Sequence, residues 1–385
     1  MPGGRPDPAR RRRRPRAPAR PQRLRDLPRA VSGIPRLGRG RSRGDDGTVR
    51  ARRAPRRFRG GVGAMRGCLE RIFLLVERVV TTFLYPWCLL RARLGGPARV
   101  PILMYHQVGR PLHPSMSRAD CVSPREFEAQ MRALRRSGYR VLPLSSVVRL
   151  LEAPGSKDLR RCAALTFDDG LRDQVAHARP VLRVHGFPAT FFLVAGHAGQ
   201  DAPLACHLFE GAAAGDRRGF PAGWLPLSWE QARRLAADGM EIGSHSISHR
   251  SLGGLGDGEI GLEVRRSKAI LEERLGVRVD LFAYPFGSGA YGDCDGRAQA
   301  MLRAAGYRAA VTTAVGRNAR GADRLALRRI PMEEGDGPFR LRCKLAGAYD
   351  WVGPLKDLWQ RCVPRRERVG EMHPAGAGGG GEAAA

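Results

Sequence analysis

Two groups of side chains in this sequence of 385 residues have the types and spacing needed for chemistry. The carboxylates Asp168 and Asp169 are adjacent after the apolar run 163–167, and His245 and His249 lie four residues apart after a second apolar run. Two imidazoles and one carboxylate are the ligand set of a catalytic zinc site that keeps one position open, and a neighbouring carboxylate can accept a proton. An Asp-Asp-Gly sequence is also an ordinary turn, and a single His is more often a simple polar side chain. Together, the two groups favour a metal site.

The apolar runs that precede these residues belong to a regular alternation of strand-like and helix-like segments. It begins with a predicted strand over 100–106, followed by a helix whose start is marked by a capping sequence at Ser123. Alternating strands and helices form parallel sheets, and roughly seven such units suggest closure. We therefore predict an α/β fold, a distorted (β/α)7-type barrel over residues 98–362. In such barrels the chemistry lies at the carboxyl ends of the strands, which adds His106 and 285–287 to the candidates.

The formal net charge of +30 is concentrated at the start of the chain. Residues 1–60 contain 21 Arg and 4 Asp and are rich in Pro and Gly. Such a segment cannot bury enough apolar surface to offset its loss of entropy, so we expect 1–66 to be a disordered tail, as we do the Gly-rich 363–385. Arg clusters bind anionic lipid or nucleic acid non-specifically, but a charge confined to a tail predicts no specific nucleic-acid partner for the folded domain. An alternative is that Met65 is the true start and the upstream residues are not translated.

A hydrophobic segment at 68–94 separates this tail from the predicted barrel. Its length approaches the roughly 20 residues of a membrane span, but Glu77 and Arg78 interrupt it and Arg residues flank it. This pattern suits an interfacial anchor or a poor transmembrane helix equally. The segment lacks an Ala-x-Ala cleavage site, which disfavours a removable signal peptide. We expect a membrane-associated protein, with the side of the membrane left open.

Taken in order, the motifs resemble those of the polysaccharide deacetylases, carbohydrate esterase family 4. The sequence Thr-Phe-Asp-Asp-Gly at 166–170 matches the first family motif, and His-Ser-Ile-Ser-His at 245–249 matches the metal-binding motif. The sequence Phe-Ala-Tyr-Pro-Phe-Gly at 282–287 resembles the third. The run 103–108 is similar to the start of a subgroup with a permuted barrel, typified by biofilm poly-β-1,6-N-acetylglucosamine deacetylases. The resemblance covers residues 100–334.

The resemblance implies a role for each candidate residue. It implies that a divalent metal ion, with zinc as the first candidate, is held by Asp169, His245 and His249. Asp168 would be the general base that takes a proton from the attacking water, and the backbone N–H of Phe286 would stabilise the oxyanion. In the permuted subgroup the acid His comes from the first strand, so we assign His106 to protonate the leaving amine. A His suits this role because its pKa lies near working pH.

The sequence departs from the family pattern at several positions. Ala283 stands where many members have an Arg, and Leu171 stands where the subgroup often has a Tyr, which puts substrate contacts there in doubt. No Leu-x-His motif follows the last strand. Arg328 and Arg329 are candidates to orient Asp168, and we expect at least one of the two to be solvated.

The predicted activity is that of a metal-dependent hydrolase that removes acetyl groups from N-acetylated amino sugars of a polysaccharide or lipid-linked glycan. One alternative is an O-acetyl esterase acting on an acetylated polysaccharide, which would use the same site. Another is a non-catalytic glycan-binding homologue, which the presence of a base, metal ligands and a candidate acid disfavours. The sequence predicts neither the glycan linkage nor the oligomeric state.

Overall fold

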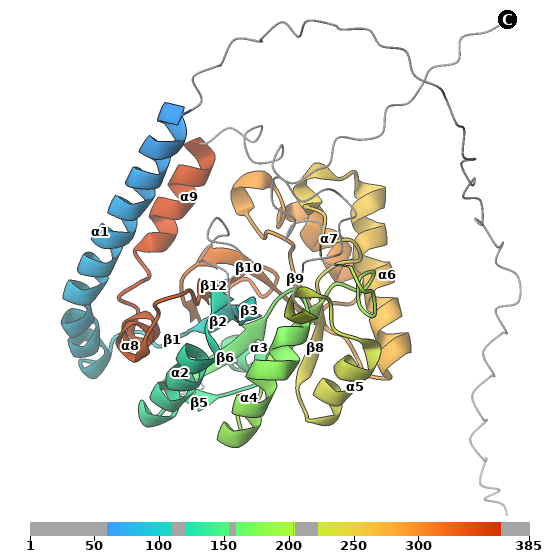
Figure 1. Cartoon of the computed structure of the whole chain (residues 1–385), viewed down its shortest axis with the longest axis horizontal. Helices are drawn as coiled ribbons and strands as arrows, with labels where there is room; N and C mark the ends of the chain where they lie inside the picture. The colour runs from blue at the N-terminus through green and yellow to red at the C-terminus, as the bar shows by residue number, and fades with distance from the viewer. Residues whose placement is uncertain (1–59, 110–120, 154–158, 203, 205–221, 363–385) are drawn as a thin grey trace, which may run out of the picture. The chain divides into compact units, whose positions relative to one another are not determined.

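In the computed structural model of this protein, seven parallel strands close into a barrel (Figure 1). The structure describes residues 60–109, 121–153, 159–202, 204 and 222–362. Around the ring they follow the order β2, β12, β10, β9, β8, β7 and β6, and β6 pairs back onto β2. Their bounds are Ile102–Tyr105 (β2), Cys162–Phe167 (β6), Thr190–Leu193 (β7), Glu241–Ser244 (β8), Leu281–Ala283 (β9), Ala309–Val315 (β10) and Leu327–Pro331 (β12). The predicted (β/α)7-type barrel is therefore confirmed. We predicted disorder for 1–66 and 363–385; residues 1–59 and 363–385 lie outside the described residues, whereas 60–66 belong to a helix that starts at Gly60.

Helices surround the barrel and connect its strands. Their bounds are Pro124–Arg136 (α2), Leu144–Glu152 (α3), Arg179–His185 (α4), Trp229–Ala237 (α5), Asp257–Leu275 (α6), Gly296–Ala304 (α7), Pro338–Ala346 (α8) and Val352–Cys362 (α9). The capping sequence predicted at Ser123 forms a capping box with Glu126 and starts α2. This helix buries Phe127, Met131 and Leu134, which recur at helical spacing and so face the barrel together.

The predicted strand over 100–106 is interrupted at Pro101. The two residues before it, Arg99–Val100 (β1), pair antiparallel with Asn318–Ala319 (β11) outside the ring, and β2 starts only at Ile102. Proline has no N–H to donate to a strand ladder, so the chain changes partner there. Three further short strands are Gln107–Val108 (β3), Cys121–Val122 (β4) and Arg140–Val141 (β5).

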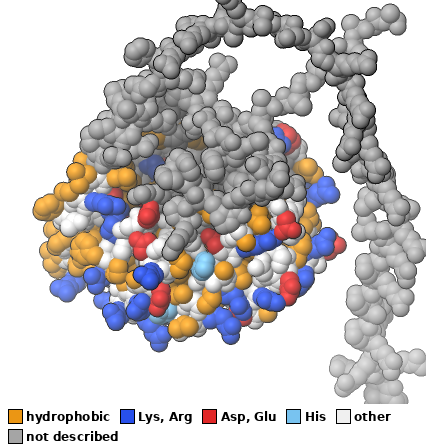
Figure 2. All heavy atoms as spheres, viewed as in Figure 1, with side chains coloured by type: hydrophobic (Ala, Val, Ile, Leu, Met, Phe, Trp, Pro, Cys, Tyr) orange, Lys and Arg blue, Asp and Glu red, His pale blue; other side chains and the backbone are white. Residues whose placement is uncertain are grey.

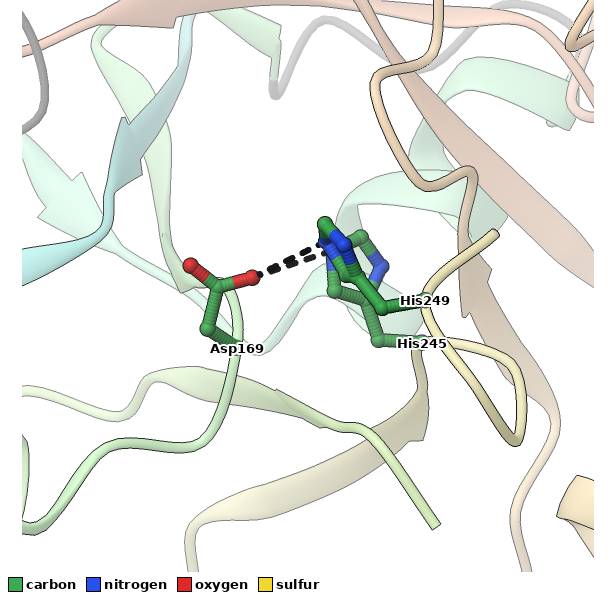
Figure 3. A group of neighbouring side chains, drawn as sticks. All are labelled: Asp169, His245 and His249. Carbon is green, nitrogen blue, oxygen red and sulfur yellow. Dashed lines mark ion pairs between the residues drawn. The ribbon is translucent and has the colours of Figure 1, made fainter. Parts of the chain in front are cut away.

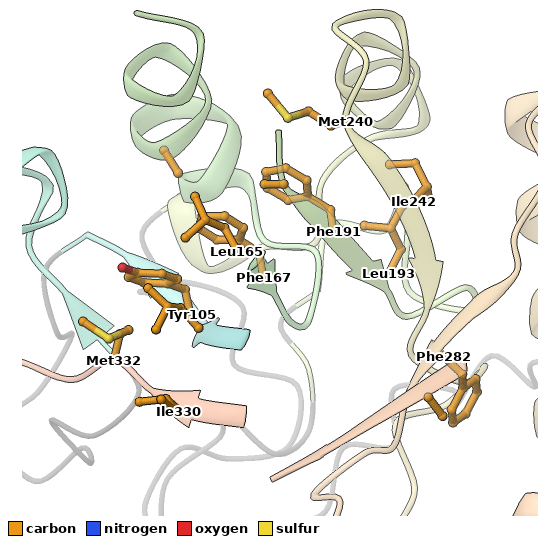
Figure 4. Close-up of a cluster of buried hydrophobic side chains, with 14 of the residues drawn as sticks. Tyr105, Leu165, Phe167, Phe191, Leu193, Met240, Ile242, Phe282, Ile330 and Met332 are labelled. Atoms are coloured by element: carbon orange, nitrogen blue, oxygen red, sulfur yellow. The ribbon is translucent and has the colours of Figure 1, made fainter. Parts of the chain in front are cut away.

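Alternate residues of each strand face the barrel interior and the surrounding helices. On the helix side, Tyr105, Phe167 and Phe191 stack with ring centroids 5.2 and 4.7 Å apart (Figure 4). The strand period of two residues places Ala164, Thr166 and Asp168 on the opposite, interior side. The run of β6 therefore delivers Asp168 to the interior at the carboxyl end of the barrel.

The hydrophobic segment predicted at 68–94 forms most of a helix of 34 residues, α1 (Gly60–Arg93). The part Phe73–Arg93 is long and apolar enough to cross a membrane, with a mean hydropathy of 1.5. Helix α1 packs against α8, and the two are drawn at the same side of the barrel in Figure 1.

Candidate metal and catalytic site

The carboxyl end of β6 turns sharply so that two adjacent carboxylates point in different directions. Asp169 has a φ of +71° and Gly170 a φ of +63°. The positive φ favours glycine at position 170, and an added Cβ atom would lie 2.7 Å from the Leu193 side chain, which would have to move. This turn separates Asp168 from Asp169 and gives them different neighbours.

Asp169, His245 and His249 form a compact cluster (Figure 3). The Asp169 Oδ1 atom lies 3.4 Å from His245 Nε2 and 3.2 Å from His249 Nε2. One ligand atom from each residue lies within 4.8 Å of the others, close enough for all three to share one ion. A carboxylate and two imidazoles suit zinc and other divalent transition metals. The structure thus brings together the three residues predicted as ligands, and their geometry fits a metal ion.

The orientation of the His245 ring is set by the neighbouring strand. Its Nδ1 atom lies 2.8 Å from the carbonyl oxygen of Ala283, at the end of β9. A carbonyl oxygen can only accept, so Nδ1 carries a proton, and Nε2 is the ring nitrogen turned towards Asp169. Such a bond to the second ring nitrogen is typical of metal-binding histidines.

The turn that carries His249 is held by Glu263 of α6, which sequence reasoning missed. Its Oε2 accepts hydrogen bonds from the backbone N–H of Ile247 at 2.7 Å and of Ser248 at 3.1 Å, and its Oε1 accepts from the Ser248 hydroxyl at 2.5 Å. Ser246 and His249 have φ values of +64° and +60°. Positive φ is costly for these residues and persists only where surrounding contacts enforce it. No motif marks Glu263, because only the packing of α6 places it there.

Asp168 is paired with Arg329 of β12 inside the barrel. The guanidinium donates to both carboxylate oxygens, at 2.6 and 2.7 Å, and both side chains are buried. Burial by itself would raise the pKa of Asp168, but the charge and hydrogen bonds of Arg329 and the nearby imidazoles of His245 and His106 more than offset it. The pKa of this carboxyl therefore lies below its ordinary value, which keeps Asp168 ionised.

The predicted acid and the predicted oxyanion donor lie at the same end of the barrel. His106 Nε2 is 3.7 Å from Asp168 Oδ2. The Gln174 side chain donates to the carbonyl oxygens of both residues, at 2.7 and 2.6 Å, and so ties the two strand ends together. Phe286, with a φ of +59°, places its ring 4.9 Å from that of His249. All six predicted site residues are therefore found at the ends of β2, β6, β8 and β9.

The structure shows the surroundings of the residues at which the sequence departs from the family pattern. At the position where many members carry an Arg, Ala283 is buried and offers only its carbonyl oxygen to His245. Of the two arginines, Arg329 is buried on Asp168, whereas Arg328 is half-exposed and lies 3.7 Å from Asp357. The prediction that one of them is solvated is confirmed. Leu171 is fully buried, so it has no surface for a substrate contact.

Comparisons with known proteins agree with this geometry. Residues 155–310 match the polysaccharide deacetylase family. YxkH of Bacillus subtilis, whose name assigns it to the polysaccharide deacetylases, is 30% identical over 242 residues, which cover 62% of this chain and 73% of YxkH. The Streptococcus pyogenes deacetylase PplD in complex with acetate has a TM-score of 0.51 at 25% identity, covering 65% of this chain and 99% of PplD. IcaB from Ammonifex degensii has a TM-score of 0.52 at 25% identity, covering 65% of this chain and 97% of IcaB. This chain therefore belongs to the polysaccharide deacetylase family and is a hydrolase of carbohydrate esterase family 4.

Proposed function

We propose that this protein is a metal-dependent N-deacetylase that acts on acetylated amino sugars of a polysaccharide or lipid-linked glycan. The observation that carries the proposal is the juxtaposition of two carboxylates with different partners. Asp168 is held ionised by Arg329, while Asp169 faces the two histidines. A base that stays ionised beside a metal-ligand cluster is the arrangement that hydrolysis of an acetyl group needs.

Each site residue has one task in this hydrolysis. When bound by Asp169, His245 and His249, a divalent cation supplies the Lewis acidity that polarises an acetyl carbonyl, and zinc suits this ligand set. Asp168 accepts a proton from the attacking water, and the N–H of Phe286 donates to the acetyl oxygen as negative charge develops there. His106 then protonates the leaving amine. An amine leaves only when protonated, so a His beside the base supports an N-acetyl substrate over an O-acetyl one.

Acetate release by the full-length protein tests this activity. We expect release from N-acetylglucosamine oligomers to stop after chelation and to return with zinc, at about one ion per chain. An O-acetylated polysaccharide assayed in parallel distinguishes the two chemistries. Faster release from the ester than from the amide would support the O-acetyl esterase instead.

Substitutions separate the metal ligands from the proton-transfer groups. Asp168→Asn removes the base with little change of shape, and we expect activity to fall about 100-fold or more while the metal stays bound. Joint His245→Ala and His249→Ala should abolish metal binding. His106→Asn should lower activity with the metal retained, and the exposed His177→Asn serves as the control. Unchanged acetate release in Asp168→Asn would contradict the assigned base.

We also propose that the protein is membrane-associated through Phe73–Arg93 of α1. The length and mean hydropathy of this segment support the proposal, as do the basic residues at its carboxyl end, Arg91 and Arg93. Co-flotation of the full-length protein with phospholipid vesicles tests the association. The side of the membrane is not part of the proposal.

A further inference from the structure

One face of α1 is docked on the catalytic barrel through polar contacts. Glu77 and Thr81 lie one turn apart on this face, and both side chains are buried. Glu77 Oε2 accepts a hydrogen bond from Arg340 Nη2 of α8 at 2.8 Å. Thr81 Oγ1 accepts one from the Trp351 indole N–H, just before α9, at 3.3 Å. Glu77, one of the two charged residues that interrupt the hydrophobic segment, therefore holds the helix against the barrel.

The contact of Glu77 extends into a buried ionic network in α8. Arg340 Nε lies 2.7 Å from Asp336 Oδ1, and Lys344 Nζ lies 2.5 Å from Asp336 Oδ2. Burial opposes the charge of Arg340, but Asp336 and Glu77 more than offset it and the pKa of Arg340 is raised. A helix that left the barrel to cross a bilayer would carry Glu77 into hydrocarbon without its partner, which is costly. The docked position is the one in which this carboxylate is satisfied.

The opposite face of α1 is apolar and exposed. It consists of Val76, Val79, Phe83, Trp87 and Leu90, which recur at spacings of three and four residues. These side chains are between 45% and 79% exposed. A solvated helix normally places polar side chains on such a face, so this one is suited to an apolar environment.

Helix α9 carries a second exposed apolar strip. Leu355, Leu358 and Trp359 recur at helical spacing and are also exposed. The indole of Trp351, the residue before α9, donates to Thr81 and so brings the start of α9 close to α1, and the two helices are drawn on the same side of the barrel in Figure 1. Figure 2 shows hydrophobic side chains gathered at this edge of the molecule. We refer to the exposed apolar residues of α1 and α9 named above as the apolar face.

Most charges around the apolar face are basic, and the acidic Asp357 of α9 lies 3.7 Å from Arg328. Arg78, Arg91 and Arg93 of α1 and Arg361 of α9 are exposed, whereas Glu77 is neutralised by Arg340. Apolar and aromatic side chains bordered by arginine match the boundary between acyl chains and anionic headgroups. A second copy of this chain would bring arginines against arginines, so charge complementarity favours an anionic bilayer over a dimer.

We propose that α1 and α9 together form an interfacial membrane surface on which the protein lies, with α1 in the plane of an anionic bilayer and docked to the barrel through Glu77. This inference rests on the proposed membrane association and specifies its geometry. It makes α9, which is far from α1 in the sequence, a second membrane contact. A spanning α1 would leave α9 without such a role.

Flotation of the full-length protein with vesicles tests the geometry. We expect stronger binding to mixed phosphatidylcholine–phosphatidylglycerol vesicles than to phosphatidylcholine alone. Leu358→Asp places a charge in the α9 half of the apolar face and should weaken binding about tenfold or more. Its control is Leu262→Asp on α6, because Leu262 is similarly exposed (51% against 60%) but lies outside the apolar face. Retained acetate release from soluble oligomers shows that each variant is folded.

A second measurement requires no charged substitution. Brominated lipids quench the fluorescence of tryptophans that enter a bilayer, and the conservative Trp359→Phe variant should remove part of that quenching. If the wild-type protein binds neither kind of vesicle, the proposed membrane association itself fails. If it binds, but Leu358→Asp binds equally well and Trp359→Phe is quenched as before, then α1 anchors the chain alone. That result would overturn the interfacial geometry and leave the association in place.

Discussion

Replacing Glu263 by Gln should weaken metal binding through the turn that carries His249. Its carboxylate accepts three hydrogen bonds from the turn 246–249, two from backbone N–H groups and one from the Ser248 hydroxyl. The turn holds Ser246 and His249 at positive φ. The carboxylate therefore stabilises a backbone conformation that these residues adopt reluctantly, and His249 reaches Asp169 only in that conformation.

The size of the effect follows from the two backbone hydrogen bonds. A hydrogen bond to a charged group contributes roughly 1.5–3 kcal/mol and one between neutral groups about 0.5–1.5 kcal/mol. The amide oxygen of a glutamine in place of Glu263 can still accept both N–H groups, so the loss is about 1 kcal/mol per bond, or roughly 2 kcal/mol in all. If this loss falls on the conformation that binds the metal, the metal affinity falls roughly 30-fold.

The assay is zinc binding by competition with a chelator of known affinity, using the full-length protein. The control is Glu273→Gln, which makes the same change at an exposed position of the same helix. The free energy of unfolding of the metal-free variants is measured in parallel, because a loosened turn should change it much less than it changes metal affinity. A Glu263→Gln protein that binds zinc within about threefold of the wild type would refute the reasoning. The turn would then keep its geometry without the carboxylate.

Three further changes test other parts of the structure. Arg329→Lys breaks the paired hydrogen bonds to Asp168 and so raises the pKa of that carboxyl. The acid limb of the kcat/KM profile should therefore move to higher pH. The control Arg328→Lys should leave the acid limb in place. Burial would raise the pKa of Asp336, but its basic neighbours on α8 more than offset burial, and the pKa is lowered. The ionised carboxylate therefore stabilises the fold at pH values above the ordinary pKa of Asp. This stabilisation is lost as the pH falls through the lowered pKa of Asp336. Asp336→Asn should cost about 3–5 kcal/mol at neutral pH and weaken the acid dependence of unfolding, as measured by denaturant titration. Gly170→Ala should lower the free energy of unfolding by roughly 1–3 kcal/mol, because the added Cβ meets Leu193 and the backbone has positive φ; an unchanged midpoint would show that the turn relaxes.

The sequence by itself determined the class of fold and the cluster of candidate ligands. The strand-to-helix alternation is a local pattern, and the carboxyl ends of parallel strands in a closed barrel meet at one rim. Asp169, His245 and His249 could therefore be placed together before their distances were known, because each follows an apolar strand. The same rule selected His106 for this rim, and the pairing of β2 with β6 in the folded barrel puts its Nε2 atom 3.7 Å from Asp168 Oδ2.

The tertiary structure alone decided which charged side chains support these residues. Arg328 and Arg329 are neighbours in the sequence, but only Arg329 is buried in the folded barrel. There it pairs with Asp168, which lies 161 positions away in the sequence. The same is true of α1. In the sequence Glu77 only interrupts a hydrophobic segment, because its partner Arg340 lies 263 positions further along the chain. Local periodicity in the sequence shows which face of a helix or strand is apolar. It does not show which residue will pair with a buried charge, because that residue is brought into contact only when the chain has folded.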